Sequence, residues 1–332
     1  MIKKPVPTGT DPIIVPPNMD YIYLENSEQV AFDPDTADFK ISNGWWLSEL
    51  SLIAYESPGF IKQILKLKGF SGFKFFDVKS CQGFVAYNDE TVVVSFRGTE
   101  VKSHYVVFDA IAEVKIKLVP FYNYGKVHAG FKESLDCVWD KETNIKGLLD
   151  ELKSKNPDIK VFFTGHSLGG ATATLAGVLY SHTTAIYTYG SPKVGDADFV
   201  SSIKCRLYRL ILPKDMIPHL PPNWDIPFMD MIKFVQSQPH FVIENNDTVS
   251  FHTNKEYDLL KSLAGSANKF GKGILGFIKN NIETNILQEK PSSPDNDFKT
   301  VMENYFLNDI TSHAPIFYCI GLWNSYVESV TV

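Results

Sequence analysis

Residues 161–171 (VFFTGHSLGGA) constrain the fold of this chain more than any other stretch. The apolar run at 159–163 predicts a fully buried strand, and the small residues at 170–177 predict a helix lying close against a sheet. Between them, Gly165 and Gly169 flank Ser167, and a Cβ at either glycine would collide with the crossing strand and helix. The pattern predicts an α/β fold whose tight turn presents the Ser167 hydroxyl. A glycine-rich helix start without chemistry is the alternative.

Asp215 is the best-placed acid to act with such a serine. A serine hydroxyl needs a base, and the base needs a group that orients it. When the serine sits on a strand–turn–helix, its partners follow in the order acid, histidine, each after a later strand. Residues 206–213 (RLYRLILP) predict a strand that ends just before Asp215, and the prolines behind it cannot continue a ladder. A turn or capping aspartate is the alternative interpretation.

The base should follow the acid, which leaves four of the eight histidines. His219 comes so soon after Asp215 that it is hard to aim at the serine. His313 lies just before an apolar helix that starts near Pro315, so its backbone is anchored while its ring can reach the site. Chemistry alone leaves His313 and His252 about equally favoured. The other downstream candidate is His240, and the upstream histidines are His104, His128, His166 and His182.

Several motifs together resemble the class 3 lipases, the fungal-type triacylglycerol lipase branch of the α/β-hydrolases. The resemblance covers about residues 80 to 225 well and the C-terminal segment weakly. The motifs occur in the order of that family: residues 95–99 (SFRGT), 127–131 (VHAGF), 164–170 (TGHSLGG), 188–195 (TYGSPKVG), 214–222 (KDMIPHLPP) and 308–313 (NDITSH).

The resemblance implies a complete set of site residues. It implies Ser167 as nucleophile, Asp215 as acid and His313 as base, because His252 lies in a segment similar to a non-catalytic histidine motif of the family. It also implies an oxyanion hole made by the backbone N–H of Leu168 and by Thr99. No metal and no cofactor are expected.

Composition excludes several other classes of protein. A chain of 332 residues with 44% hydrophobic residues can bury the core of one large domain. A net charge of −6 gives no sign of the basic surface that nucleic-acid binding requires. The cysteines lack metal-site spacing and are expected to be free thiols. No signal peptide or transmembrane segment is evident, so we expect a cytoplasmic protein or one exported by a leaderless route. The four cysteines are Cys81, Cys137, Cys205 and Cys319.

We expect one α/β-hydrolase domain over residues 1–332, with a mostly parallel central sheet and helices on both faces. Residues 1–40 are expected to form an extended arm, and residues 253–300 a helical insertion with a flexible loop. The expected helices cover 45–55, capped by Asn43 or Ser42, then 131–155 and 314–323. The expected strands cover 72–78, 82–88, 91–97, 159–164, 185–189 and 206–212, and a hairpin at 241–251 turns on Asn245 and Asn246.

Two apolar segments suggest contact with lipid. Residues 101–122 follow the oxyanion motif directly and occupy the position of a lid in the resembled family. Residues 260–277 carry an apolar stripe flanked by lysines, which suits either a lipid interface or an ordinary packed surface helix.

The expected function is hydrolysis of acyl esters of glycerol through an acyl-enzyme, with lipid esters as substrate and transient contact with a lipid interface. A phospholipase A-type enzyme is the nearest alternative. A peptidase or acyltransferase would share the same machinery, and a non-catalytic lipid-binding protein would keep only the fold.

Overall fold

The computed structural model describes residues 1–7, 21–99, 117–141, 143–215, 217–220, 234–235, 237, 240–244, 247–252 and 313–331. The α-helices are α1 (Ile41–Ile53), α2 (Pro58–Leu67), α4 (Ala129–Asp136), α5 (Ile145–Lys155), α6 (Leu168–Leu179), α7 (Ala197–Ser202) and α11 (Pro315–Thr331), and the 3₁₀ helices are η2 (Ser27–Gln29) and η3 (Ile217–His219). The strands are β1 (Gly72–Val78), β2 (Cys81–Tyr87), β3 (Thr91–Phe96), β4 (Leu118–Pro120), β5 (Lys126–His128), β6 (Lys160–His166), β7 (Thr183–Tyr189), β8 (Arg206–Ile211), β9 (His240–Ile243) and β10 (Val249–His252).

A large mixed sheet forms the centre of the molecule. Its strand order is β1-β2-β3-β6-β7-β8-β9-β10. The strands from β3 to β9 pair in parallel, whereas β1, β2 and β10 add antiparallel edges. The central strands are buried along nearly their whole length, as their continuous apolar runs predict. The carboxyl ends of β6, β7 and β8 therefore meet at one edge of the sheet.

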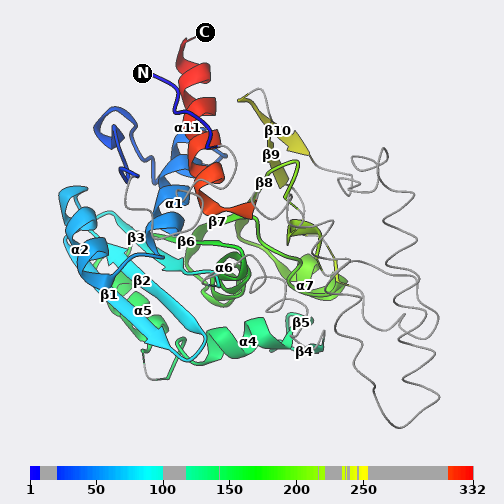
Figure 1. The fold of residues 1–332 in the computed structure, drawn as a ribbon. Helices are drawn as coiled ribbons and strands as arrows, with labels where there is room; N and C mark the ends of the chain where they lie inside the picture. Colours follow the sequence, from blue (N-terminus) through cyan, green and yellow to red (C-terminus); the bar gives the residue numbers. More distant parts are fainter. Residues whose placement is uncertain are drawn as a thin grey trace, which may run out of the picture.

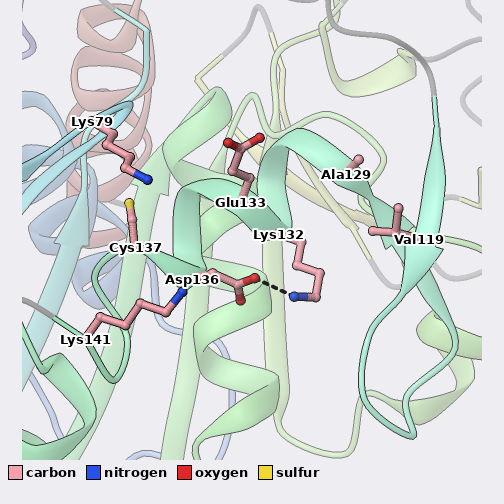
Figure 2. A pocket seen from close by; sticks show the side chains of 8 residues that line it. All are labelled: Lys79, Val119, Ala129, Lys132, Glu133, Asp136, Cys137 and Lys141. Atoms are coloured by element: carbon pink, nitrogen blue, oxygen red, sulfur yellow. Dashed lines mark hydrogen bonds and ion pairs between the residues drawn. The ribbon is translucent and has the colours of Figure 1, made fainter.

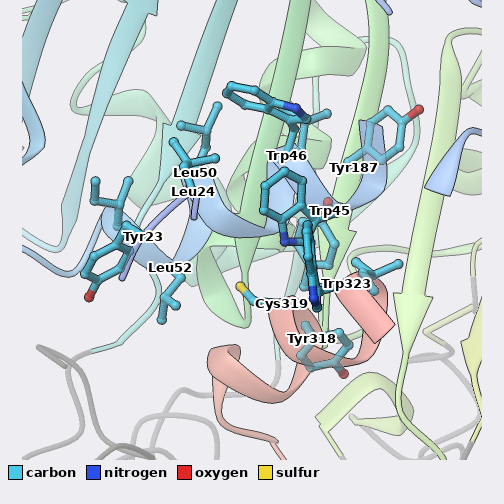
Figure 3. Close-up of a cluster of buried hydrophobic side chains, with 14 of the residues drawn as sticks. Tyr23, Leu24, Trp45, Trp46, Leu50, Leu52, Tyr187, Tyr318, Cys319 and Trp323 are labelled. Carbon is cyan, nitrogen blue, oxygen red and sulfur yellow. The ribbon is translucent and has the colours of Figure 1, made fainter. Parts of the chain in front are cut away.

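Helices cover both faces of this sheet, as the sequence predicts for an α/β-hydrolase. Helices α1 and α11 lie side by side on one face, and α6 packs on the other with α4 against it (Figure 1). On the first face, Trp45 of α1 meets Trp323 of α11 with ring centroids 5.2 Å apart (Figure 3). Burying two such aromatic side chains contributes several kcal/mol. This packing anchors α11, which begins at Pro315, two residues after His313.

Most of the predicted elements are confirmed, including the strands before and after the serine, the antiparallel β1–β2 pair, the β9–β10 hairpin and the helix that begins at Pro315. The turn residues Asn245 and Asn246 of that hairpin lie outside the described residues.

Two expectations are wrong. The predicted helix over 131–155 is two helices, because Asn144 has a left-handed backbone (φ 48°) and caps α5 by accepting the Gly147 N–H at 2.9 Å. Helix α1 begins at Ile41, so neither Ser42 nor Asn43 is its cap; Asn43 instead bonds both the N–H and the C=O of Asp33.

Parts of the expected arm and insertion cannot be compared with the structure. The described residues 21–40 pack on α1, where the Trp46 indole donates to the Val30 carbonyl at 2.6 Å. The expected insertion at 253–300, its apolar stripe, and residues 100–116 of the expected lid lie outside the described residues. Within the part of the chain that the structure describes, no helix is long and apolar enough to cross a membrane.

Candidate active site

Ser167 occupies the tight turn between β6 and α6. Its backbone has φ 57° and ψ −128°, a conformation that side-chain-bearing residues rarely adopt. The two flanking glycines are needed by close approach: a Cβ on Gly165 would lie 2.4 Å from the carbonyl carbon of Gly169, and one on Gly169 would lie 2.1 Å from the Phe96 oxygen. The strained turn predicted from the sequence is present, and it presents the serine at the carboxyl end of β6.

Asp215 and His313 form a buried pair. The Asp215 Oδ2 lies 2.7 Å from the His313 Nδ1, although the two residues are 98 positions apart in the chain. Asp215 has no exposed surface, and its carboxylate also accepts from the Tyr318 hydroxyl at 2.6 Å and from the Ile217 N–H at 2.9 Å. An ionised carboxylate can only accept, so Nδ1 carries the proton and Nε2 is left bare.

The bare nitrogen of His313 is available for chemistry. Its Nε2 is buried and has no hydrogen-bond partner among the residues that the structure describes. A buried polar atom without a hydrogen-bond partner lowers the stability of the folded protein by about 1–3 kcal/mol. Such an atom is typical of a functional group that binds a substrate or a proton during the reaction. The pair therefore has the protonation pattern of a general base oriented by an acid.

Strand β7 brings the serine and the pair together. The Ser167 N–H donates to the Tyr189 carbonyl at 2.9 Å, and Gly190 follows directly. A Cβ on Gly190 would lie 2.7 Å from Asp215 Oδ2 and 2.9 Å from His313 Cε1. Consecutive residues of one strand end thus touch the serine on one side and the acid–base pair on the other. The structure gathers all three residues proposed as a triad at one edge of the sheet.

The two expected oxyanion donors flank the same serine. Leu168 is the first residue of α6, so its N–H has no acceptor within the helix. Thr99 follows β3, and its neighbour Gly98 is close enough that a Cβ there would lie 3.2 Å from the Ser167 Cβ and 2.7 Å from the His166 oxygen. The loop 97–99 therefore runs alongside the serine, as an oxyanion loop requires.

The other histidine candidates are placed elsewhere. His252 ends the edge strand β10, with β9, β8 and β7 between it and β6. His240 begins β9, and its register partner is His252. His219 ends η3, and burial lowers its pKa to about 4. Among these histidines, the one hydrogen-bonded to Asp215 is His313.

Three residues that contact the triad were not predicted from the sequence. Tyr318 holds the acid, Gly190 makes room for the pair, and His166 bonds the His313 carbonyl through Nε2 at 2.6 Å. Gly190 lies within the recognised motif at 188–195, so its φ of 60° had a signal in the sequence. His166 lies within the recognised motif at 164–170, although its partner His313 is 147 positions away along the chain. Tyr318 had no such signal, because its partner Asp215 lies 103 positions away.

A hollow lies apart from this site, over α4. It has a volume of about 500 Å³ and shares no residue with the triad (Figure 2). Three lysines and two carboxylates line it, and one pair among them, Lys132 and Asp136, is joined by an ion pair. Its lining residues are Lys79, Val119, Ala129, Lys132, Glu133, Asp136, Cys137 and Lys141. Among the described residues, no cluster of three or more His, Cys, Asp or Glu side chains could hold a metal ion.

The fold and the site together define the chain as an α/β-hydrolase with a serine–histidine–aspartate site. In this class, the serine lies on a strained turn between a strand and a helix. The acid and the histidine follow it in the sequence, in that order, after later strands.

Comparison with known proteins relates part of the chain to a family. Residues 93–224 match the family Lipase (class 3). The chain is 41% identical over 102 residues to the secreted mono- and diacylglycerol lipase 1 of Fusarium solani, covering 29% of this chain and 30% of that protein. It is 34% identical over 153 residues to a lipase of Rhizomucor miehei, covering 40% of this chain and 41% of the relative. The aligned part is therefore less than half the length of these relatives.

The fold is also similar to a solved structure, the triacylglyceride lipase of Rhizomucor miehei. That structure superposes with a TM-score of 0.51 and 24% identity, over 67% of this chain and 89% of the other. At this identity, the likeness supports the fold alone.

Proposed function

We propose that the chain is a serine carboxylic-ester hydrolase that cleaves acyl esters of glycerol through an acyl-enzyme. The observation that carries the proposal is the buried Asp215–His313 pair, whose bare Nε2 lies at the same sheet edge as the strained Ser167. The name of one relative, a mono- and diacylglycerol lipase, supports glycerol esters as the substrate class.

In the first half of the reaction, the Ser167 oxygen attacks the ester carbonyl while His313 Nε2 takes the hydroxyl proton. The carbonyl oxygen becomes an oxyanion, which the N–H groups of Leu168 and Thr99 stabilise; one such donor is worth about 3 kcal/mol. The bond between the carbonyl carbon and the alcohol oxygen then breaks. The leaving oxygen takes the proton from Nε2, and the acyl group stays on the serine.

In the second half, water replaces the alcohol. His313 Nε2 takes one proton from water as its oxygen attacks the acyl carbon, and returns that proton to Ser167 as the ester bond breaks. Asp215 remains ionised throughout, since it orients the ring and stabilises the transient imidazolium. The products are a free carboxylic acid and the unchanged serine.

The proposal includes transient contact with a lipid surface. Among the described residues, Tyr122 in the turn between β4 and β5 is 62% exposed, and Lys132 lies 5.9 Å from the centre of its ring. An exposed aromatic ring beside a cation suits the boundary between water and lipid.

The experiment that tests the function is hydrolysis of a substrate panel by the wild type and by Ser167→Ala. The panel contains p-nitrophenyl esters, triacylglycerols, diacylglycerols and phospholipids, and the matched control is Ser201→Ala, an exposed serine on α7. We expect cleavage of glycerol esters by the wild type and the control only. A preference for phospholipids would instead assign phospholipase A-type activity, and no cleavage of any ester would contradict the proposal.

A further inference from the structure

A buried chain of contacts links the loop beside Ser167 to His313. Gly98 packs against the Tyr55 hydroxyl, since a Cβ added to Gly98 would lie 2.3 Å from that oxygen, and the same hydroxyl lies 3.0 Å from His166 Nδ1. The other ring nitrogen of His166 lies 2.6 Å from the His313 carbonyl oxygen. These contacts join the expected oxyanion loop, at Gly98, to the backbone of the proposed base.

The chemistry of the groups fixes the direction of every bond in this chain. The His313 carbonyl can only accept, so His166 Nε2 must carry a proton. In a neutral ring, Nδ1 then accepts, and the Tyr55 hydroxyl donates to it. Burial, together with the neighbouring His313, holds the pKa of His166 well below its usual value, and burial raises the pKa of Tyr55. Both side chains therefore stay neutral, and the chain has one arrangement of protons.

Tyr55 is positioned by helix α1, which ends two residues before it. That helix is bonded to two strands of the sheet: the Ser51 and Thr164 hydroxyls lie 2.8 Å apart, and the Ser95 hydroxyl donates to the Leu50 carbonyl at 2.9 Å. The Arg97 guanidinium lies 5.3 Å from the centre of the Tyr55 ring. The tyrosine is therefore held from the sheet side and in turn holds the loop 97–99.

His166 also packs directly on the base. Its ring and that of His313 have centroids 4.4 Å apart and planes inclined by 36°. His166 thus contacts His313 twice, once through the ring face and once through the carbonyl. Since Asp215 fixes only Nδ1, a second anchor is needed to fix the place of the residue as a whole.

We propose that Tyr55 and His166 are positioning residues, which hold the oxyanion loop and His313 in one fixed relation across Ser167. This inference rests on the proposed function, because both ends of the chain are parts of the proposed catalytic site. Neither residue touches the reacting atoms. They act by keeping the proton acceptor and the oxyanion donors in register, so that both are in place at once in the transition state.

The test uses three substitutions that cut the chain at different bonds. Tyr55→Phe removes the hydroxyl, and with it the bond to His166 and the contact with Gly98. His166→Gln places an amide N–H where Nε2 stands and so retains the bond to His313, whereas His166→Asn replaces Nδ1 and loses that bond. The half-buried Tyr326 on α11 provides the control Tyr326→Phe.

We expect Tyr55→Phe and His166→Asn to lower kcat for a short soluble ester by about ten- to a hundredfold per titrated active site, with KM unchanged. His166→Gln keeps the bond to His313 but has no atom at Nδ1 for the Tyr55 hydroxyl, so its loss should match that of Tyr55→Phe, and Tyr326→Phe should match the wild type. In the double variant Tyr55→Phe/His166→Asn, the losses should be less than multiplicative, since both cut one chain. Full kcat in Tyr55→Phe or in His166→Asn would overturn the proposal.

A second measurement separates this inference from the proposed function. In protein carrying ¹⁵N-labelled histidine, NMR reports the tautomer of His166 without any turnover. We expect the Nε2–H form in the wild type, with the His313 ring signals shifting together with the Gly98 amide in Tyr55→Phe. An Nδ1–H tautomer, or an unmoved His313, would overturn the inference. A wild type that cleaves no ester but shows these signals would contradict the proposed function alone.

Discussion

Gly190 lies against the carboxylate of Asp215: a Cβ at residue 190 would stand 2.7 Å from Oδ2. The same added atom would stand 2.9 Å from His313 Cε1, and the backbone φ of Gly190 is 60°. The end of β7 therefore has two reasons to carry a glycine, one conformational and one steric. The acid–base pair fits its place only because this residue has no side chain.

Gly190→Ala should displace the pair. We expect kcat for ester hydrolysis to fall at least about tenfold and the free energy of unfolding to fall by about 1–3 kcal/mol, because alanine is strained at this φ and meets two buried groups. The measurements are steady-state kinetics and urea unfolding. The control is Gly59→Ala in α2, where an added Cβ has nothing within 4 Å. Equal behaviour of the two variants would show that the pair tolerates a side chain there.

His313→Ala should abolish hydrolysis, while His252→Ala should retain most of it. Triad members act as a unit, so the loss in kcat on removing the base should approach about a millionfold. The backbone of His252 lies on the far edge strand β10, with three strands between it and β6. The rates are compared on a short soluble ester. If the two variants exchanged behaviour, the base would be His252.

The two partners of the Asp215 Oδ2 should contribute unequally. Asp215→Asn replaces the acceptor for Nδ1, which favours the wrong tautomer of His313, and kcat should fall by about 10⁴-fold. Tyr318→Phe removes one buried hydrogen bond of 2.6 Å and leaves the aspartate–histidine bond. It should cost about 1–2 kcal/mol of stability and less than tenfold in kcat. A larger kinetic loss in Tyr318→Phe than in Asp215→Asn would contradict this assignment.

His128 should make the protein sensitive to acid. Burial lowers its pKa to about 4 from 6.5, so the unfolded state binds a proton first as the pH falls. The neutral, buried His128 contributes its full stabilisation above pH 6.5, and this contribution is lost as the pH falls towards 4. At pH 5 the loss in the free energy of unfolding is about 2 kcal/mol.

The variant that tests this is His128→Asn, since an asparagine can still cap α4 as the His128 Nδ1 does when it accepts the Gly130 N–H. Unfolding by urea at pH 7.5 and pH 5 should show a smaller loss between the two values in the variant. An identical loss in both proteins would assign the acid sensitivity to other groups.

The proposed lipid contact predicts a break in the rate curve. The rate is measured against the concentration of a short triacylglycerol, taken through its solubility limit. We expect the rate to rise abruptly when droplets form, because a lipid surface offers apolar groups of the enzyme a partner, at about 25 cal/mol per Å². A smooth hyperbola through the limit would mean that the surface plays no part, and the enzyme would be an esterase.

The sequence predicts those elements of the fold whose signals lie within one continuous stretch of residues. Strand β6, the turn at Ser167 and helix α6 follow from one run of eleven residues, because burial and glycine placement are local signals. The break between α4 and α5 was missed, since it depends on the left-handed Asn144, which propensity alone does not reveal.

The three residues of the proposed triad could be predicted from the sequence, but the residues that contact them could not. The order of serine, acid and base restricts the candidates, and the family resemblance selects among them. The bonds from Tyr55 to His166 and from His166 to His313 join residues 111 and 147 positions apart. No periodicity or spacing encodes such pairs, because they are set by how the sheet and its covering helices pack.

The most direct test of the central claim is covalent labelling of the nucleophile. The wild type is treated with an organophosphonate that mimics an ester, and the labelled peptide is identified by mass spectrometry while hydrolysis of p-nitrophenyl butyrate is followed in the same sample. The account predicts one adduct per chain, on Ser167, with hydrolysis lost in proportion to labelling and no adduct in His313→Ala. Hydrolysis that persists in fully labelled protein, or an adduct on another residue that tracks the loss of activity, would contradict it.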